Sequence, residues 1–138
     1  MSKTYPLPHI IDFPSIGKPA EGYISVGEAE KKIPFKVERV FWTYFTPEDI
    51  VRGRHAHHET QQLLIAAAGR IIVTTEMPDK SIQTFILDRP DKGVYVPPNA
   101  WHTMQYSHNA VQLVFASTLY NEKDYIRNYD DFIKIYGA

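Results

Sequence analysis

The fold class is indicated most clearly by residues 62–96, which read QLLIAAAGRIIVTTEMPDKSIQTFILDRPDKGVYV. Apolar and β-branched runs occur here at 62–67, 70–76, 84–87 and 93–96. Glycine, proline and aspartate separate these runs, because such residues favour turns over extended backbone. Short strands at such close spacing predict an antiparallel sandwich or barrel rather than alternating strands and helices.

The segments on either side extend this pattern. Residues 37–45, 54–57 and 111–117 predict further short strands. Residues 1–30 contain four prolines and three glycines. We therefore expect this first segment to be irregular, apart from one short strand at 23–26.

The C-terminal segment predicts one amphipathic helix. Aromatic and apolar side chains recur there at helical spacing, namely Tyr125, Tyr129, Phe132, Ile133 and Tyr136. Asn121 is suited to be the N-cap of this helix, and Asp124 follows three residues later. Together the patterns predict an all-β barrel with one C-terminal α-helix, whose aromatic stripe packs against the barrel or against a second subunit.

The composition excludes several classes of protein. The chain has 138 residues, enough for one domain that spans 1–138. Its formal net charge of -1 argues against a nucleic-acid partner. The absence of cysteine excludes disulfides and thiolate metal ligands. No apolar run reaches the roughly 18 residues that a membrane span needs, and no signal peptide is evident, so we expect a cytoplasmic protein with no membrane partner.

His55 and His57 are the first candidates for chemistry. Residues two apart on a strand project from the same face, so both imidazoles are expected to lie together. Such a pair suits proton transfer or metal binding, because imidazole titrates near neutral pH and is a common metal ligand. A pair of exposed or hydrogen-bonded strand histidines is the other interpretation that these residues alone leave open.

The surroundings of this pair follow a recognisable pattern, made of His55, His57, Gln62, Gly69, Gly93, Pro97 and His102. The pattern resembles the two motifs of the cupin superfamily of small jelly-roll barrels, in which the motif residues face the interior. Metal-binding cupins carry glutamate where this chain has Gln62. Because a neutral amide is a weak ligand, no resident metal is expected.

Further stretches match one family within this superfamily: Ile33-Pro34-Phe35, Arg52-Gly53-x-His55-Ala56-His57, Trp101-His102-x-Met104 and Tyr120-x-Glu122-x-Asp124-Tyr125-Ile126-Arg127. They resemble the nucleotide-sugar 3,4-ketoisomerases, also called WxcM-like proteins. That family interconverts the keto groups of dTDP-4-keto-6-deoxyhexoses, normally has glutamine at the position of Gln62, and needs no metal. The resemblance implies an isomerase without a cofactor, which supplies precursors of 3-amino sugars for bacterial surface polysaccharides.

Two departures from the family bear on the substrate. The family usually has Asp-x-Arg-Gly where this chain has Ala20-Glu21-Gly22, and Arg-Val-Tyr-Tyr where it has Arg39-Val40-Phe41-Trp42. Both segments lie near the sugar in the family. The reaction type is expected to hold, while the exact sugar and the C4 configuration of the product stay open.

The resemblance also implies roles for single residues. We expect His57 to take the proton from C3 of the sugar and His55 to carry the hydroxyl proton between the two oxygens, with the opposite assignment left open. Arg52 is expected to stabilise the enediolate or to bind the diphosphate of the sugar nucleotide. Gln62 is expected to hydrogen-bond the sugar, and His102 to return the proton at C4.

Three aromatic residues, Trp42, Tyr44 and Tyr95, are expected to line the pocket unless they belong to the core. The resemblance also implies a homodimer that binds a dTDP-linked 4-keto-6-deoxyhexose. Other functions stay open, namely a non-catalytic nucleotide-sugar-binding cupin, a 3,5-epimerase with a His–Asp base pair and a tyrosine acid, and a metal-dependent cupin enzyme that uses His55, His57, Gln62 and His102.

Overall fold

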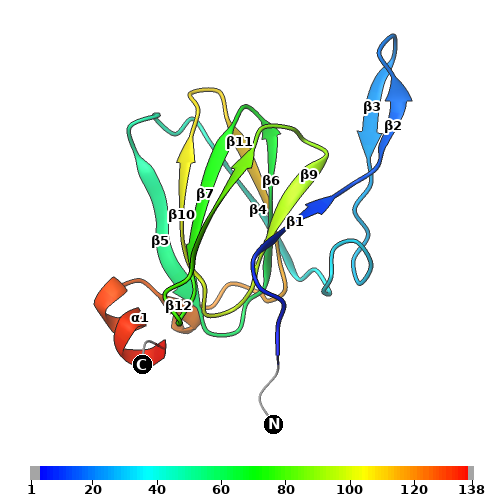
Figure 1. Ribbon diagram of the computed structural model, residues 1–138. Helices are drawn as coiled ribbons and strands as arrows, with labels where there is room; N and C mark the ends of the chain where they lie inside the picture. Colours follow the sequence, from blue (N-terminus) through cyan, green and yellow to red (C-terminus); the bar gives the residue numbers. More distant parts are fainter. Residues whose placement is uncertain (1–3, 137–138) are drawn as a thin grey trace.

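The computed structural model describes residues 4–136, and it contains two five-stranded sheets that face each other (Figure 1). The first sheet has the order β1-β9-β6-β11-β4, formed by His9–Asp12, Lys92–Val96, Gln62–Ala68, Val111–Ala116 and Arg39–Tyr44. The second has the order β12-β5-β10-β7-β8, formed by Tyr125–Ile126, Val51–His57, Trp101–Tyr106, Ile71–Glu76 and Ile82–Leu87. This arrangement confirms the predicted all-β jelly-roll barrel. Residues 1–3 and 137–138 of the predicted domain lie outside the described residues.

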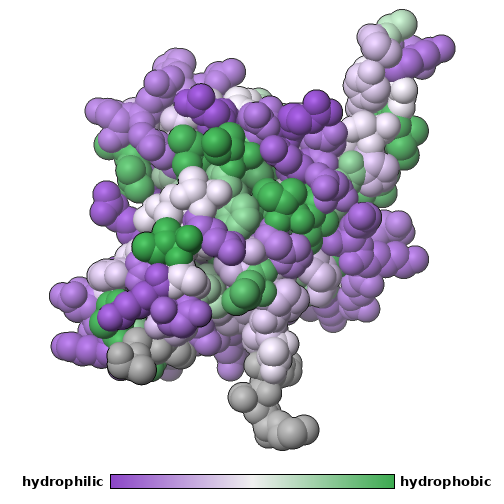
Figure 2. Space-filling view, viewed as in Figure 1, coloured by the Kyte–Doolittle hydropathy of each residue, from purple (hydrophilic) through white to green (hydrophobic). Residues whose placement is uncertain are grey.

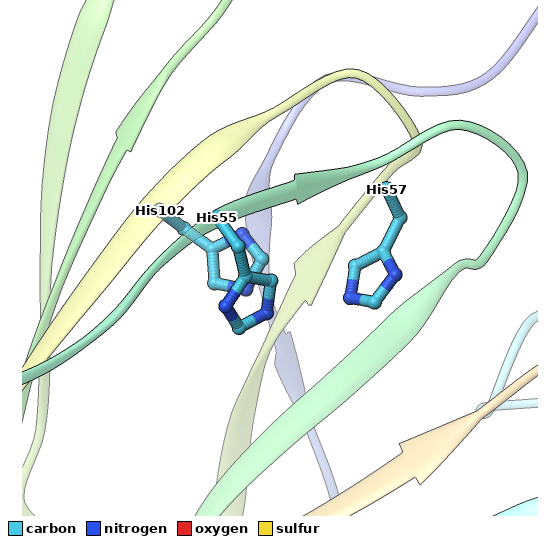
Figure 3. Close-up of side chains that lie close together, drawn as sticks. All are labelled: His55, His57 and His102. Carbon is cyan, nitrogen blue, oxygen red and sulfur yellow. The ribbon is translucent and has the colours of Figure 1, made fainter. Parts of the chain in front are cut away.

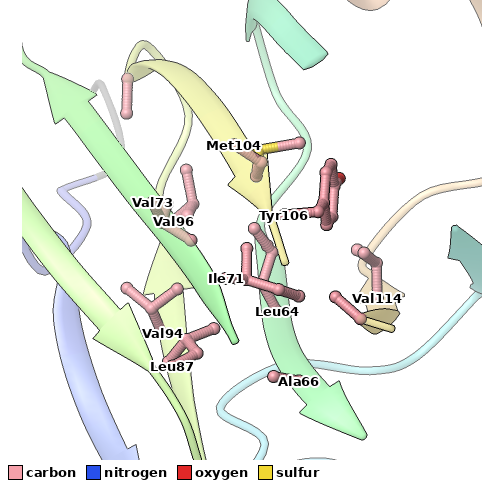
Figure 4. Close-up of a cluster of buried hydrophobic side chains, with 12 residues drawn as sticks. Leu64, Ala66, Ile71, Val73, Leu87, Val94, Val96, Met104, Tyr106 and Val114 are labelled. Carbon is pink, nitrogen blue, oxygen red and sulfur yellow. The ribbon is translucent and has the colours of Figure 1, made fainter. Parts of the chain in front are cut away.

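Alternation along the strands builds a core between the two sheets. In β7, for example, Ile71 and Val73 are fully buried, whereas the residues between and beyond them are partly exposed. β10, which the sequence analysis did not predict, likewise buries every second residue. Figure 4 shows members of this core from both sheets, namely Leu64, Ala66, Ile71, Val73, Leu87, Val94, Val96, Met104, Tyr106 and Val114.

The C-terminal helix α1 is shorter than predicted and spans Tyr129–Tyr136. Asn121 caps a 3-10 turn instead (η1, Glu122–Asp124), and Asn128 caps α1. Between them, Tyr125 lies in β12, because the open edge of β5 pairs with this segment before the helix begins. The prediction of a single α-helix is confirmed for residues 4–136, and no helix in this range is long and apolar enough to cross a membrane.

Helix α1 packs against the outer side of β5 (Figure 1). Phe132 is fully buried there and packs with Ala56 of β5 and Ile126 of β12. Ala56 lies between His55 and His57 in the sequence, so its side chain points away from theirs. The helix therefore supports, from behind, the part of β5 that carries both histidines.

The N-terminal segment contains more strand than the sequence predicted. β1 pairs with β9 at one edge of the first sheet. β2 (Ser15–Lys18) and β3 (Gly22–Ser25) form a hairpin that stands away from the barrel (Figure 1), and the strand expected at 23–26 is its second arm. Gly17 has a φ of 144°, and a Cβ added there would lie 2.1 Å from the Gly22 oxygen. The glycines led us to expect an irregular segment here, but Gly17 instead permits the two strands of the hairpin to pair closely.

We expect Phe132→Ala to lower the free energy of unfolding by roughly 3–5 kcal/mol, the usual cost of removing a buried phenylalanine side chain. Urea denaturation at pH 7 measures the change. Ile135→Ala is the matched control on the same helix, because Ile135 is 54% exposed and its truncation should cost less than about 0.5 kcal/mol. Equal effects of the two substitutions would contradict the packing of α1 against β5.

Candidate active site

Three histidines meet inside the barrel, two from β5 and one from β10 (Figure 3). His55 and His102 are register partners on neighbouring strands, and their ring centroids lie 4.6 Å apart. The ring of His57 lies 5.0 Å from that of His55 and 6.1 Å from that of His102. One ring nitrogen of each histidine lies within 4.8 Å of the others. The structure therefore brings together the three histidines that the sequence singled out.

A β-bulge in β5 turns Arg52 toward the same side as the histidines. His55 and Arg52 are three residues apart on β5, whereas their partners on β10 are only two residues apart. The extra residue reverses the alternation once, so that Arg52, His55 and His57 all face the interior. The bulge is built on Gly53, whose φ is 87°. A Cβ added to Gly53 would lie 2.9 Å from the backbone oxygen of His102, so the two strands approach closely here.

Each imidazole is held through its Nδ1. His55 Nδ1–H donates to a backbone carbonyl two residues earlier at 3.0 Å, and His102 Nδ1–H does the same at 2.9 Å. His57 Nδ1–H donates to Asp124 Oδ2 at 2.8 Å. Because carbonyl and carboxylate oxygens only accept, each Nδ1 carries a hydrogen, and in the uncharged form of each ring the lone pair lies on Nε2. His57 Nε2 is buried without a hydrogen-bond partner in residues 4–136, as a base awaiting a substrate proton would be.

Asp124 is the centre of a hydrogen-bond network that fixes His57. Its Oδ1 accepts from the Glu59 backbone N–H at 2.7 Å, and its Oδ2 accepts from the Thr60 hydroxyl as well as from His57. Burial alone raises the pKa of the Asp124 carboxyl, yet these hydrogen bonds together lower it to about 2. The carboxylate therefore stays ionised at neutral pH and stabilises positive charge on the His57 ring.

Burial keeps the other two imidazoles uncharged. It lowers the pKa of His55 to about 4, and the charge of neighbouring His57 adds to the effect. Burial likewise lowers the pKa of His102, again helped by the other two histidines. At neutral pH His55 and His102 therefore present lone pairs rather than positive charge to the interior.

A cavity of about 140 Å³ adjoins the histidines between the two sheets, lined by residues of β4, β6 and β11 from one sheet and of β5 and β10 from the other. Four of the predicted site residues line it, namely Arg52, His55, Gln62 and His102. A larger groove of about 430 Å³ lies on the outer side of the first sheet, beside β2 and β3. Its charged residues, Arg89 and Asp91, bind each other at 2.9 Å. Of these two, the smaller cavity is the one lined by imidazoles, which can move protons.

The structure does not place Trp42, Tyr44 and Tyr95 in this cavity. Trp42 and Tyr44 lie on the outer side of β4 and are 61% and 55% exposed. Side chains alternate along the strand, and Phe41 and Thr43 are the ones that face inward. Tyr95 is fully buried, but in a separate outer cluster, where its hydroxyl donates to Gln61 Oε1 at 2.8 Å. The expectation that these aromatic residues line the pocket is wrong for Trp42 and Tyr44, whereas Tyr95 belongs to the core, the alternative that the sequence left open.

Sequence reasoning missed the roles of Asp124, Tyr125 and Arg127. The ring of Tyr125 lies 4.4 Å from that of His57, and its hydroxyl accepts from Arg39 Nη1 at 3.2 Å. The Arg127 guanidinium lies 4.2 Å above the Tyr125 ring, and Arg127 also lines the cavity. Asp124, Tyr125 and Arg127 all belong to the tail on which the family resemblance was based, so the resemblance could have indicated them as site residues. The helical spacing of the aromatic residues instead predicted that Tyr125 lies in a helix.

The three histidines do not fit a resident metal as they lie. Nitrogen ligands about 2.1 Å from a tetrahedral ion lie about 3.4 Å from one another. The histidine nitrogens are spread over as much as 4.8 Å, and the side chain that would complete the set, Gln62, is a neutral amide. We derive no step of the chemistry through a metal.

We expect Gly53→Ala to destabilise the protein by more than Gly22→Ala does. Both glycines have φ near 87°, which costs an alanine roughly 1–2 kcal/mol. Only at Gly53 does the new Cβ also meet backbone, whereas Gly22 has nothing within 4 Å. Urea denaturation measures both losses, and equal losses would contradict the close approach of β5 and β10 at the bulge.

The depressed pKa of His55 has a consequence for stability. The unfolded chain binds a proton at His55 near pH 6.5, whereas the folded chain does so only near pH 4. The free energy of unfolding should therefore fall as the pH drops from about 6.5 to about 4. NMR titration of the ring should show an uncharged His55 at pH 5, and His55→Gln should weaken the fall measured by urea denaturation. Titration of His55 at pH 6.5 or above would contradict the burial described here.

Comparison with known proteins places the chain in a family. Residues 7–137 match the family described as FdtA: WxcM-like, C-terminal. The TDP-4-oxo-6-deoxy-alpha-D-glucose-3,4-oxoisomerase of Aneurinibacillus thermoaerophilus is 39% identical over 116 residues, or 83% of each chain. A solved 3,4-ketoisomerase from Helicobacter canadensis is 35% identical with a TM-score of 0.88, and the match covers 93% of this chain and 96% of that one.

A third relative was solved with a sugar nucleotide bound. The 3,4-ketoisomerase QdtA from Thermoanaerobacterium thermosaccharolyticum, as a histidine-to-asparagine variant in complex with TDP-4-keto-6-deoxyglucose, is 32% identical. Its TM-score is 0.89, and the match covers 96% of both chains. On these matches, together with the histidine-lined barrel interior, the chain belongs to the FdtA (WxcM-like) family.

Proposed function

We propose that this protein is an isomerase that moves the keto group of dTDP-4-keto-6-deoxyglucose from C4 to C3. The observation that carries the proposal is the set of three imidazoles that meet inside the barrel: His55 and His102 line one cavity, and His57 beside them is bound through Nδ1 to Asp124. The relatives named 3,4-ketoisomerases support the reaction type, and the one solved with TDP-4-keto-6-deoxyglucose supports the substrate.

The reaction needs two proton movements and no redox cofactor. A base removes the proton from C3, next to the ketone, which leaves an enediolate, and a proton is later returned at C4. The proton of the C3 hydroxyl must also pass to the C4 oxygen. We assign the first step to His57, because Asp124 stabilises the imidazolium that forms. We assign the passage between oxygens to His55, which lines the cavity and has an uncharged ring.

The other cavity residues have supporting roles in this proposal. Arg52 faces the cavity and can stabilise the negative enediolate, while Gln62 can hydrogen-bond a sugar hydroxyl. His102 directs a lone pair inward, since its Nδ1–H is held by a backbone carbonyl. His102 can therefore return a proton at C4 only after it has received one. The proton that balances the reaction is the one that His57 takes from C3, because the hydroxyl proton carried by His55 goes to the C4 oxygen.

The direct test is proton NMR of dTDP-4-keto-6-deoxyglucose incubated with the protein in deuterium oxide. The proposal predicts a 3-keto product with deuterium at C4 and exchange at C3. A 3,5-epimerase is the second candidate, because a His–Asp pair with a tyrosine nearby also suits it, as in His57, Asp124 and Tyr125. Exchange at C5 without movement of the keto group would establish that second function instead.

Substitution of the two β5 histidines separates their roles. We expect His57→Asn to reduce turnover by at least roughly 10²-fold, the usual contribution of a general base, and to abolish exchange at C3. His55→Asn should slow net isomerisation but leave some exchange at C3, because only the transfer between oxygens is lost. The affinity for dTDP should change little in either variant. Wild-type exchange in His57→Asn would show that the base lies elsewhere.

We also propose that the protein is a homodimer in which a second copy covers the projecting β2–β3 hairpin. Figure 2 shows hydrophobic side chains on this hairpin, and Ile16, Tyr23 and Ile24 are all more than half exposed. An apolar arm that stands away from its own barrel gains stability from burial against a partner. That the whole chain is one domain, and that it acts in the cytoplasm, stay predictions.

Light scattering at micromolar concentration should give about twice the 15.9 kDa mass of one chain. Ile24→Ser should shift the protein toward monomer, because Ile24 is 66% exposed on the hairpin. Ile82→Ser is the control, since Ile82 is 63% exposed on β8 at the far edge of the second sheet. A wild-type monomer, or equal effects of both substitutions, would contradict a dimer through the hairpin.

A further inference from the structure

The cavity contains a second polar group, which the proton transfers do not use. Gln112 of β11 and Tyr106 of β10 both line it, and they are 1% and 3% exposed. The Tyr106 hydroxyl donates to Gln112 Oε1. Thr43, the register partner of Gln112 on β4, also hydrogen-bonds the Tyr106 hydroxyl. These three side chains come from both sheets and meet across the barrel.

The direction of these hydrogen bonds fixes the orientation of the Gln112 amide. Burial raises the pKa of Tyr106 to about 12, so the phenol keeps its proton at neutral pH. The nearby charge of Arg52 and the hydrogen bond to Thr43 oppose that rise only in part. The phenol proton is then given to Oε1 of Gln112. The Nε2 group of Gln112 is therefore turned away from Tyr106.

Gln112 Nε2 has no hydrogen-bond partner in residues 4–136, although it is buried. An amide nitrogen carries two donor hydrogens, and leaving a buried donor unpaired costs about 1–3 kcal/mol. Most buried polar groups in folded proteins have a partner, so an unpaired donor on a cavity wall calls for an explanation. A ligand oxygen that enters the cavity supplies one.

The cavity is chemically asymmetric in a way that suits such a ligand. The histidines present acceptor lone pairs, whereas Gln112 and Arg52 present only donors. At about 140 Å³ the cavity is smaller than the roughly 300–1,000 Å³ of pockets that enclose drug-sized ligands. It is therefore too small to enclose a whole sugar nucleotide, and in this proposal it takes the hexosyl group alone.

We infer that Gln112 is a sugar-binding residue, whose Nε2–H donates to an oxygen of the hexosyl group, and that Tyr106 is the positioning residue that holds the amide in that orientation. The inference rests on the proposed function for the identity of the ligand. The role of Gln112 is inferred from its buried Nε2, which has no partner among the described residues, and from the hydrogen bond that its Oε1 accepts from Tyr106. Tyr106 acts only through Gln112 in this account and gives its own proton to Oε1 rather than to the sugar.

The test is the paired substitution Tyr106→Phe with Gln112→Met, which replaces both partners by apolar side chains of similar shape. Removing both members of a buried polar pair can be neutral or stabilising, and here it also removes an unpaired donor. The double variant should therefore match or exceed the wild type in urea denaturation. Gln112→Met alone should be less stable than the double variant, because it leaves the Tyr106 hydroxyl without its acceptor.

Calorimetry with dTDP-glucose and with dTDP measures the sugar contact without turnover. The wild type should bind dTDP-glucose more tightly than the double variant does, by roughly tenfold for one lost hydrogen bond. Both proteins should bind dTDP equally. Gln83→Met is the control, since Gln83 lies exposed on β8, and it should change neither affinity.

Two results would overturn the inference. If the double variant binds dTDP-glucose as the wild type does, Gln112 does not touch the sugar. If it is much less stable and binds both ligands more weakly, the pair is structural. Failure of the proposed function is a separate result, namely a wild type that binds dTDP-glucose but does not isomerise dTDP-4-keto-6-deoxyglucose.

Discussion

The hydrogen bond between Asp124 and His57 is the interaction on which the site depends. It joins residues 67 positions apart, and it ties the tail of the chain to the inner end of β5. The same carboxylate accepts hydrogen bonds from Thr60 and Glu59, so it holds the loop after β5 as well. One ionised group thus fixes the tautomer of His57 and holds the adjoining loop in place.

Packing on the opposite side of β5 makes this geometry rigid. Alternation sends Ala56 outward to Phe132 of α1, while His55 and His57 point inward. The bulge at Gly53 then adds Arg52 to the same inner side. Since protein interiors are close-packed, a shift of the helix or of the bulge would move the imidazoles that face the cavity. Of the aromatic stripe that the sequence offered for core or dimer packing, Phe132 belongs to the core of the chain itself.

Much of this arrangement follows from local sequence rules. The runs within residues 62–96 correctly predict short antiparallel strands, and the two-residue spacing of His55 and His57 correctly places both on one face. The same rule could not decide which face of β4 is inner, so Trp42 was placed inside although it is exposed. Strand parity depends on pairing with distant strands, which no local pattern contains.

The long-range parts of the site were beyond such rules. Asp124 was predicted as part of a helix start, yet it reaches back across the fold to His57. Tyr125 has the spacing of a helical residue, yet edge pairing with β5 gives it a strand conformation. In both cases a tertiary contact outweighed local preference, as it does when a short segment meets an open sheet edge.

The most direct test of this account is nitrogen NMR of the uncharged His57 ring, with Asp124→Asn as the comparison. The account predicts a hydrogen on Nδ1, bound to the carboxylate, and a pyridine-like Nε2 that bears the lone pair. The signals of Asp124→Asn should depart from this pattern toward a mixture of tautomers, because the amide can donate as well as accept. A wild-type ring with its hydrogen on Nε2 would contradict the assignment of His57 as the base.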